Sequence, residues 1–215
     1  MNDFFAGAMS GIAQTVVGHP FDTLKIRMQN SLSIQHMKPT HYFRGIAYPL
    51  GFASIINAIG FSTYELLYAQ SNSHILAGAL SGCAISPILH FRDIGKVQRQ
   101  IGNSLTLRSF LTTHGIWGTL ARESIAFALY YSSYHALREK DVSILVSGGA
   151  SGLINWTFTY PLDVVRNRMY AQRISARKAF LQKQLWKGYS FCAIRAVLVN
   201  SVGFWVYEKF RLRSR

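Results

Sequence analysis

Acidic residues are scarce in this chain of 215 residues, where nine Asp and Glu stand against 23 Lys and Arg, giving a formal net charge of +14. Charged residues of both signs make up only 15%, whereas 49% of the residues are hydrophobic. The positive excess suits nucleic acid, an anionic membrane surface or an anionic ligand. Runs of Lys and Arg interleaved with aromatic residues are missing, so we expect no nucleic acid partner.

Cysteine is nearly absent as well. Cys83 and Cys192 stand in apolar surroundings without CxxC spacing, which predicts buried free thiols and neither a disulfide framework nor a zinc site. We recognise no nucleophile–base pair, phosphate loop or metal cluster, so we expect neither an enzyme nor a cofactor. The opening Met1-Asn2-Asp3 is neither a basic signal-peptide region nor an Arg-rich presequence, and any targeting signal is expected to be internal.

What the chain does contain is an internal repeat with three copies. Each copy has a Gly-x-x-x-Gly motif followed by an acid-x-x-base turn, and later a glycine that precedes a tyrosine by a constant distance. The glycine motifs are Gly7/Gly11, Gly78/Gly82 and Gly148/Gly152, and the glycine–tyrosine pairs are Gly45/Tyr64, Gly115/Tyr134 and Gly188/Tyr207. Because both series stay in phase, we predict one domain with the repeats 1–72, 73–141 and 142–215.

Each repeat contains two long apolar stretches rich in Gly, Ala, Ser and aromatic residues. They predict helices over 3–29, 46–68, 74–100, 116–138, 142–170 and 189–211. Each stretch can cross a hydrocarbon core of about 30 Å, and three Gly-x-x-x-Gly motifs in register predict close helix packing. We therefore predict an all-α membrane protein, with six transmembrane helices in three pseudo-threefold repeats around a central cavity. A soluble helical-repeat domain would need polar outer faces, which these stretches lack.

The connections between the predicted helices alternate between short and long. Residues 70–73 and 139–141 form the short ones, while the longer ones carry many of the basic residues. An even number of spans places both termini on the side of the short connections. Most of the positive charge then lies on the opposite side, as the positive-inside rule expects.

Three sets of charged residues interrupt the apolar stretches, where ionisable side chains are costly and usually face an interior or a partner. The first set lies near the ends of the odd-numbered helices and comprises Asp22, Lys25, Asp93, Lys96, Asp163 and Arg166. Around a threefold axis each acid can reach the base of another repeat, which predicts the ion pairs Asp22–Lys96, Asp93–Arg166 and Asp163–Lys25. Local pairing within each helix is the alternative, worth a few tenths of a kcal/mol, and the helix-bending prolines Pro20 and Pro161 argue against it.

The second set ends the even-numbered helices. It contains two acids, Glu65 and Glu208, and two bases, Arg138 and Arg211, so at most two ion pairs can form there. His135 takes the place of the third acid. We therefore predict that the first set closes its end of the cavity more firmly than the second.

The third set lies at mid-span and comprises Arg122, Glu123 and Arg195. The two arginines stand at the same distance past their repeat glycines, which puts them at one depth, and Phe52 holds that position in the first repeat. Arginine suits a carboxylate ligand, and Glu123 suits an ammonium. Internal Arg122–Glu123 or Arg195–Glu123 pairing without a ligand is the alternative.

The repeated pattern resembles P-x-[DE]-x-x-[KR]-x-[KR] followed by aromatic-[KR]-Gly, the hallmark of the mitochondrial carrier family. Residues 43–45 and 186–188 match its second part, whereas Phe91 replaces the proline of the second copy and His114 its aromatic-base pair. The resemblance implies a multi-pass protein of the mitochondrial inner membrane that works by alternating access. It makes the first charged set a matrix gate, the second a cytoplasmic gate and the third a substrate site. Gln29 and Gln100 resemble the glutamine braces of the matrix gate, and Tyr170 holds the third such position.

Details resemble the carnitine, ornithine and basic-amino-acid branch of the family, namely residues 17–23, the pair Arg122-Glu123, and Trp156. Indole can cover a cationic group, although a packing role for Trp156 is equally open, and Asn57 can add a polar contact. The resemblance implies a zwitterionic or cationic amino-acid-like solute or carnitine, membrane lipid including cardiolipin, and a monomer. The repeats are about seventy residues long and shorter than the family's, so a non-transporting structural membrane subunit stays an alternative, as does a nucleotide carrier.

Overall fold

The computed structural model describes residues 2–35, 37–104 and 115–212, with side chains except at 2–8, 145, 200, 203–204, 207–208 and 210–212. All described elements are helices. The long ones are α1 (Asn2–Gln29), α2 (Ala47–Ser71), α3 (His74–Ile101), α5 (Ile116–Arg138), α6 (Ile144–Gln172) and α8 (Tyr189–Leu212), and the short ones are η1 (Pro39–Phe43) and α7 (Ala176–Leu181). The prediction of an all-helical chain is confirmed, and each predicted end lies within three residues of the observed one.

Short polar residues start α3 and α6. Ser73 accepts a hydrogen bond from the backbone N–H of Leu76, and Ser143 does the same for Val146. These N-caps satisfy backbone donors that the first helical turn leaves unpaired. The two tight connections therefore begin a new helix almost as soon as the previous one ends.

A proline interrupts each of the helices α1, α3 and α6. Pro20 and Pro161 are those of the repeat motif, and α3 contains Pro87, one turn before Phe91. Pro87 stands outside the motif position, which Phe91 occupies in the second repeat. A proline one turn earlier on the same helix face removes a backbone hydrogen bond at nearly the same level.

The repeat glycines that precede α2 and α8 have a structural requirement of their own. Gly45 and Gly188 have φ values of 83° and 87°, in the left-handed region that favours glycine. A Cβ on Gly45 would lie 3.0 Å from the carbonyl oxygen of Lys96, and one on Gly188 would lie 3.3 Å from that of Lys25. The glycines thus let the even-numbered helices start directly against the ends of α3 and α1.

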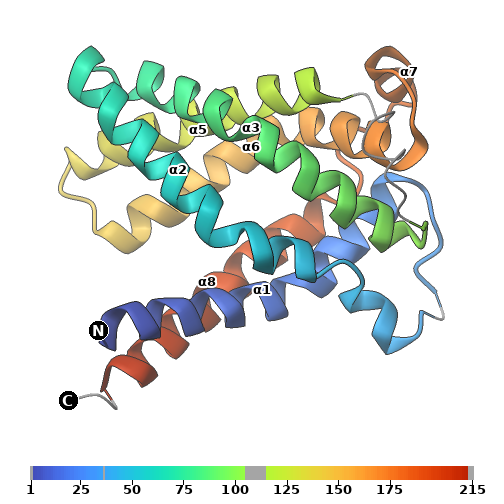
Figure 1. Cartoon of the computed structure of the whole chain (residues 1–215), viewed down its shortest axis with the longest axis horizontal. Coiled ribbons are helices and arrows are strands. Elements are labelled where there is room, and N and C mark those ends of the chain that lie inside the picture. The colour runs from blue at the N-terminus through green and yellow to red at the C-terminus, as the bar shows by residue number, and fades with distance from the viewer. Residues whose placement is uncertain (1, 36, 105–114, 213–215) are drawn as a thin grey trace.

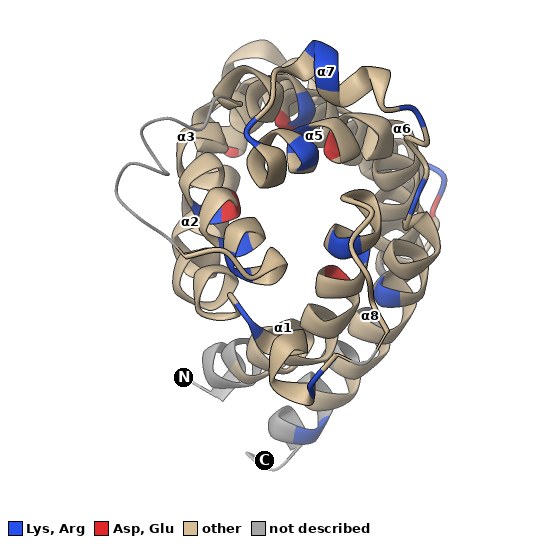
Figure 2. Cartoon of the chain, turned by 90° about the vertical axis from the view of Figure 1, so that its right-hand side faces the viewer, with Lys and Arg blue, Asp and Glu red and all other residues tan. Residues whose placement is uncertain are grey.

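The long helices surround a central space when the molecule is viewed from its end (Figure 2). Helices α2, α3, α5 and α6 pack successively, and α1 packs along α8, whereas the contacts of α1 with α2 and of α8 with α6 are sparse. The pair α1–α8 accordingly diverges from the other helices toward the end that holds the chain termini (Figure 1). The short connections lie at this same end, and η1 and α7 lie at the opposite one, as predicted from the loop lengths.

Close packing through Gly-x-x-x-Gly holds for α3. A Cβ on Gly82 would lie 2.4 Å from the carbonyl oxygen of Glu123, and one on Gly78 would lie 2.7 Å from that of Phe127. By contrast, a Cβ on Gly11, Gly148 or Gly152 would meet no atom of another helix within 4 Å. The prediction was therefore wrong for α6 and for the described part of α1, because the seams α1/α2 and α6/α8 are open in this conformation.

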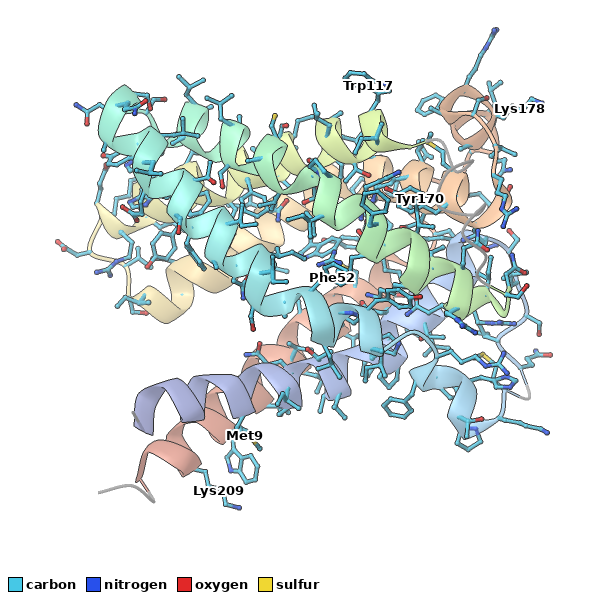
Figure 3. All side chains as sticks on the ribbon, viewed as in Figure 1. Met9, Phe52, Trp117, Tyr170, Lys178 and Lys209 are labelled. Atoms are coloured by element: carbon cyan, nitrogen blue, oxygen red, sulfur yellow. The ribbon has the colours of Figure 1, made fainter. Side chains whose placement is uncertain are left out.

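Large apolar side chains cover the outside of the helices. Trp117 is 78% exposed and points outward (Figure 3), and Phe158 is 69% exposed. Exposed apolar surface on this scale suits contact with lipid. Two described stretches, Pro39–Ser71 and His74–Ile101, reach the length and hydropathy typical of a membrane span.

Candidate functional site

A cavity of about 320 Å³ lies between the six long helices, each of which contributes to its wall. Ionisable side chains dominate the lining. The cations are Lys25, Arg92, Lys96, Arg122, Arg166 and Arg195, and the anions are Asp22, Asp93 and Asp163. They come from α1, α3, α5, α6 and α8, so the site exists only when helices of all three predicted repeats come together.

Three ion pairs connect α1, α3 and α6 across the axis of the molecule, and we call them the ion-pair ring. Lys25 Nζ lies 2.7 Å from Asp163 Oδ2, and Lys96 Nζ lies 2.6 Å from Asp22 Oδ2. Arg166 Nη2 lies 3.3 Å from Asp93 Oδ2. These are the partners that repeat symmetry predicts. Of the local alternatives, only Arg166–Asp163 is present among the described residues, at 3.0 Å.

Arg166 has a larger role than the repeat pattern suggested. Besides Asp93 and Asp163, its Nη1 donates to Glu123 Oε1 at 2.7 Å. Glu123 also accepts hydrogen bonds from Arg122 Nη1 at 2.7 Å on each oxygen. The internal Arg122–Glu123 pair that sequence analysis left open is thus present. Sequence reasoning missed the Glu123–Arg166 contact because the two residues belong to different charged sets, 43 positions apart.

Arg195 also reaches the ion-pair ring. Its Nε lies 2.9 Å from Asp22 Oδ1, so Asp22 is shared between Arg195 and Lys96. The expected alternative pair, Arg195–Glu123, is not present between these two described residues. Both mid-span arginines and Glu123 therefore connect directly or through one residue to the ring.

Trp156 lies on the cavity wall, where cations of the protein approach its ring. Lys25 Nζ is 4.4 Å and Arg122 Cζ is 4.8 Å from the ring centroid, within the range of cation–π attraction. The indole thus contacts both the ion-pair ring and the mid-span set. Asn57 does not line this cavity but a second one, together with Asn155 of α6.

The two predicted glutamine braces behave differently. Gln29 donates to Asp163 Oδ2 at 3.3 Å and to the Tyr160 hydroxyl at 3.2 Å, and it accepts from Asn167 at 2.8 Å. Gln29 therefore joins an acid of the ion-pair ring to its surroundings. Gln100 donates to Thr23 Oγ1 at 3.1 Å, and its own oxygen has no partner among the described residues.

Tyr170, in the third brace position, places its aromatic ring 6.0 Å from Arg166 Cζ, but its hydroxyl forms no hydrogen bond with a residue of the ion-pair ring. Its hydroxyl forms a hydrogen bond with Thr119 and another, of 2.9 Å, with His90 Nδ1. Its side chain is fully buried and points into the helix assembly (Figure 3). Tyr170 therefore ties α6 to α3 and α5 rather than holding an ion pair.

The opposite end of the cavity has no comparable ring among the described side chains. Glu65 forms no ion pair with another described residue, and Arg138 donates to the carbonyl oxygen of Val142 at 2.6 Å. The side chains of the other two predicted members, Glu208 and Arg211, lie outside the described residues.

An aromatic stack occupies the α2, α3 and α5 side of this end. The Tyr64 hydroxyl lies 2.7 Å from His74 Nδ1 and 3.0 Å from His135 Nε2. The two imidazole centroids are 3.8 Å apart, and Tyr131 stacks on Tyr64 at 3.7 Å. His135, which replaces the acid of the motif, therefore bonds within the stack instead of forming an ion pair.

Comparison with known proteins identifies the origin of this arrangement. The family model described as mitochondrial carrier protein matches residues 1–74 and 139–183. The chain belongs to the mitochondrial carrier family. The family match leaves out residues 75–138, most of the second predicted repeat.

Individual carriers align with nearly the whole chain. The mitochondrial basic amino acids transporter of Bos taurus is 30% identical, covering 94% of this chain and 88% of that protein. The mitochondrial arginine transporter of Arabidopsis thaliana is 28% identical, covering 96% and 89%. The glutamate/glycine mitochondrial carrier of Schizosaccharomyces pombe is 22% identical, covering 96% and 92%. Mitochondrial carriers are transporters and not enzymes, and they have a six-helix membrane fold in the mitochondrial inner membrane.

Proposed function

We propose that this carrier moves a zwitterionic or cationic amino-acid-like solute, or carnitine, across the inner membrane by alternating access. In this proposal the helices are arranged as the pseudo-threefold repeats 1–72, 73–141 and 142–215, and the chain crosses the membrane six times. The observation that carries the proposal is the direct contact between the mid-span set and the ion-pair ring. Glu123 shares Arg166 with the ring, and Arg195 shares Asp22 with it.

The charge of the cavity narrows the class of solute. Six cations and three anions line it, and Glu123 lies directly behind Arg122, which leaves an excess of two positive charges. Because every anion is already paired, a solute whose only charged groups are cationic would find no free anionic partner and would add to this excess in a site of low dielectric. The solute should therefore carry at least one carboxylate, as an amino acid or carnitine does.

A bound solute can open the closed end of the cavity by competing with residues of the ion-pair ring for their charged partners. A solute carboxylate at Arg195 would compete with Asp22, and a solute ammonium at Glu123 would compete with Arg166. Either exchange frees a charge of the ion-pair ring and weakens the closed end. In the proposal this end faces the matrix, since it holds η1, α7 and the basic connections, and the end where α1 and α8 diverge from the other helices faces the cytoplasmic side (Figure 1).

The relatives support an amino-acid-like solute, because three kinds of carrier among them are named for arginine, for basic amino acids and for glutamate and glycine. Two further pockets at the end that holds η1 and α7 support lipid binding. One joins Trp186 to Lys183 and Lys187, and the other joins Tyr48 to Arg44, with Arg99 beside it. Basic and aromatic groups suit the phosphates and acyl chains of cardiolipin, which we propose as a lipid partner of a monomeric carrier.

Uptake into proteoliposomes tests the proposed function. We expect saturable uptake of arginine or ornithine and no competition by agmatine, the decarboxylated form of arginine. Glu123→Gln and Arg195→Gln should reduce uptake at least tenfold, whereas the charge-matched control Lys178→Gln, on the outward face of α7 (Figure 3), should leave it unchanged. Equal uptake in all three variants, or inhibition by agmatine equal to that by arginine, would contradict the assignment.

A non-transporting membrane subunit is the second candidate, favoured by the family match that leaves out residues 75–138. This candidate predicts no solute flux in liposomes that contain correctly folded protein. A nucleotide carrier would instead be stabilised by ADP and not by amino acids in a thermal-shift panel, so the same preparation separates all three functions.

A further inference from the structure

A second cavity, of about 280 Å³, lies between α2, α5 and α6. Its wall is mainly apolar and aromatic, with Ile56 from α2 and Phe127, Tyr130 and Tyr131 from α5. Helix α2 is separated from α6 by α3 and α5 in the order of packing. Residues of α2 and α6 can therefore line one cavity only on the inner side of the helix assembly, where the charged cavity also lies.

The two cavities are lined by neighbouring residues of the helices that they share. Asn155 lines the second cavity, and the next residue, Trp156, lines the charged one. On α5, Phe127 follows Arg122 by five residues, which is about 7.5 Å along the axis. Only a solute longer than this axial separation, such as an amino acid whose side chain has several methylenes, can reach from the charged cavity into the second one.

Two asparagine side chains line this cavity, and their amide groups have few hydrogen-bond partners among the described residues. Asn57, which is exposed, has no hydrogen bond to another described residue, and Asn155, which is half-buried, uses only its oxygen, which accepts from Thr159 at 3.3 Å. An amide in a membrane span is costly unless it bonds to a neighbour, to water or to a ligand. The open amide groups thus indicate a cavity that holds water or a solute rather than one that packing will close.

We propose that this second cavity binds the apolar side chain of a solute whose zwitterionic head lies at Arg122 and Glu123. The preferred solute class is then an α-amino acid, or a similar zwitterion, with an aliphatic or aromatic tail. The inference rests on the proposed function and adds a determinant of specificity to it. In volume, a dry cavity of 150 Å³ is known to accept benzene, so 280 Å³ has room for a phenyl ring or a medium alkyl chain.

A homologous series of straight-chain α-amino acids, from alanine to 2-aminooctanoic acid, tests this proposal in thermal-shift titrations and in competition for uptake. Each added methylene that enters the cavity should tighten binding about fourfold, the equivalent of about 0.8 kcal/mol. Asn57→Trp should fill the cavity and abolish the dependence on chain length. The control is Ile55→Trp on the same helix, because Ile55 is 50% exposed and lies outside the cavity lining.

The outcomes separate this inference from the proposed function. A steep series that becomes flat in Asn57→Trp but not in Ile55→Trp supports the second cavity as the tail site. If arginine, lysine or alanine binds but affinity does not change along the series, or if Asn57→Trp leaves the slope intact, the tail site is refuted and the proposed function stands. If no amino acid of any length binds, both are refuted.

Discussion

Arg166 is the residue on which the closed end of the cavity depends most. Its guanidinium pairs with three carboxylates, those of Asp93, Glu123 and Asp163, while its own side chain is only 6% exposed. Arg166→Gln would leave three buried anions that share the remaining cations. Removing one partner of a buried charge pair typically costs about 3–5 kcal/mol, because the remaining charge has lost its compensation.

The matched substitutions set the scale of this effect. Lys25→Gln removes one ion pair of Asp163, whose carboxylate still has Arg166 Nη2 as a partner at 3.0 Å. We therefore expect the free energy of unfolding to fall by about 1–3 kcal/mol, as for one charged hydrogen bond. Arg166→Lys keeps the charge, but an ammonium lacks the planar fork that reaches three acceptors, and we expect an intermediate loss. The expected order of stability is wild type, then Lys25→Gln, then Arg166→Lys, then Arg166→Gln.

Thermal unfolding of the detergent-solubilised protein measures this order. For a chain of this length about 1 kcal/mol corresponds to 2–4 °C in Tm, so Arg166→Gln should lower Tm by roughly 6–20 °C. Arg177→Lys, on the exposed face of α7, is the control and should shift Tm by less than about 1 °C. The double variant Arg166→Gln with Glu123→Gln should lose less than the sum of the single losses. The reasoning is refuted if Arg166→Lys matches the wild type or if Lys25→Gln is the more damaging change.

Two further contrasts can be measured in the same assay. Gln29→Ala should lower the free energy of unfolding by about 1–3 kcal/mol, because Asp163 loses a hydrogen-bond donor. Gln100→Ala removes a single hydrogen bond and should lower it by about 0.5–1.5 kcal/mol. Equal losses would show that contact with the ion-pair ring adds nothing to stability. Gly82→Ala should destabilise the protein by about 1–3 kcal/mol, because the new Cβ would meet the backbone of α5. Gly152→Ala should be neutral or slightly stabilising, because its surroundings are open and alanine favours the helix. A larger loss in Gly152→Ala than in Gly82→Ala would mean that the α6/α8 seam is closed in solution.

Much of the architecture could be predicted from the sequence because it depends on local pattern. Long apolar stretches bounded by Gly, Ser and Asn predicted every long helix to within three residues. The partners of the ion-pair ring followed from the phase of the repeats, since symmetry relates each acid to one base. The sequence by itself therefore determined the helical class, the ends of the helices, and which charges could meet at the closed end.

The tertiary structure alone decided how those charges are shared. Whether Arg166 reaches Glu123, or Arg195 reaches Asp22, depends on the tilt and rotation of α5, α6 and α8, to which no local pattern is sensitive. The same applies to Asn57, expected in the charged cavity and found in the second one. The three similar Gly-x-x-x-Gly motifs differ in their packing because the contacts between helices are unequal. Helix α3 packs closely on α5, whereas the seams α1/α2 and α6/α8 are open.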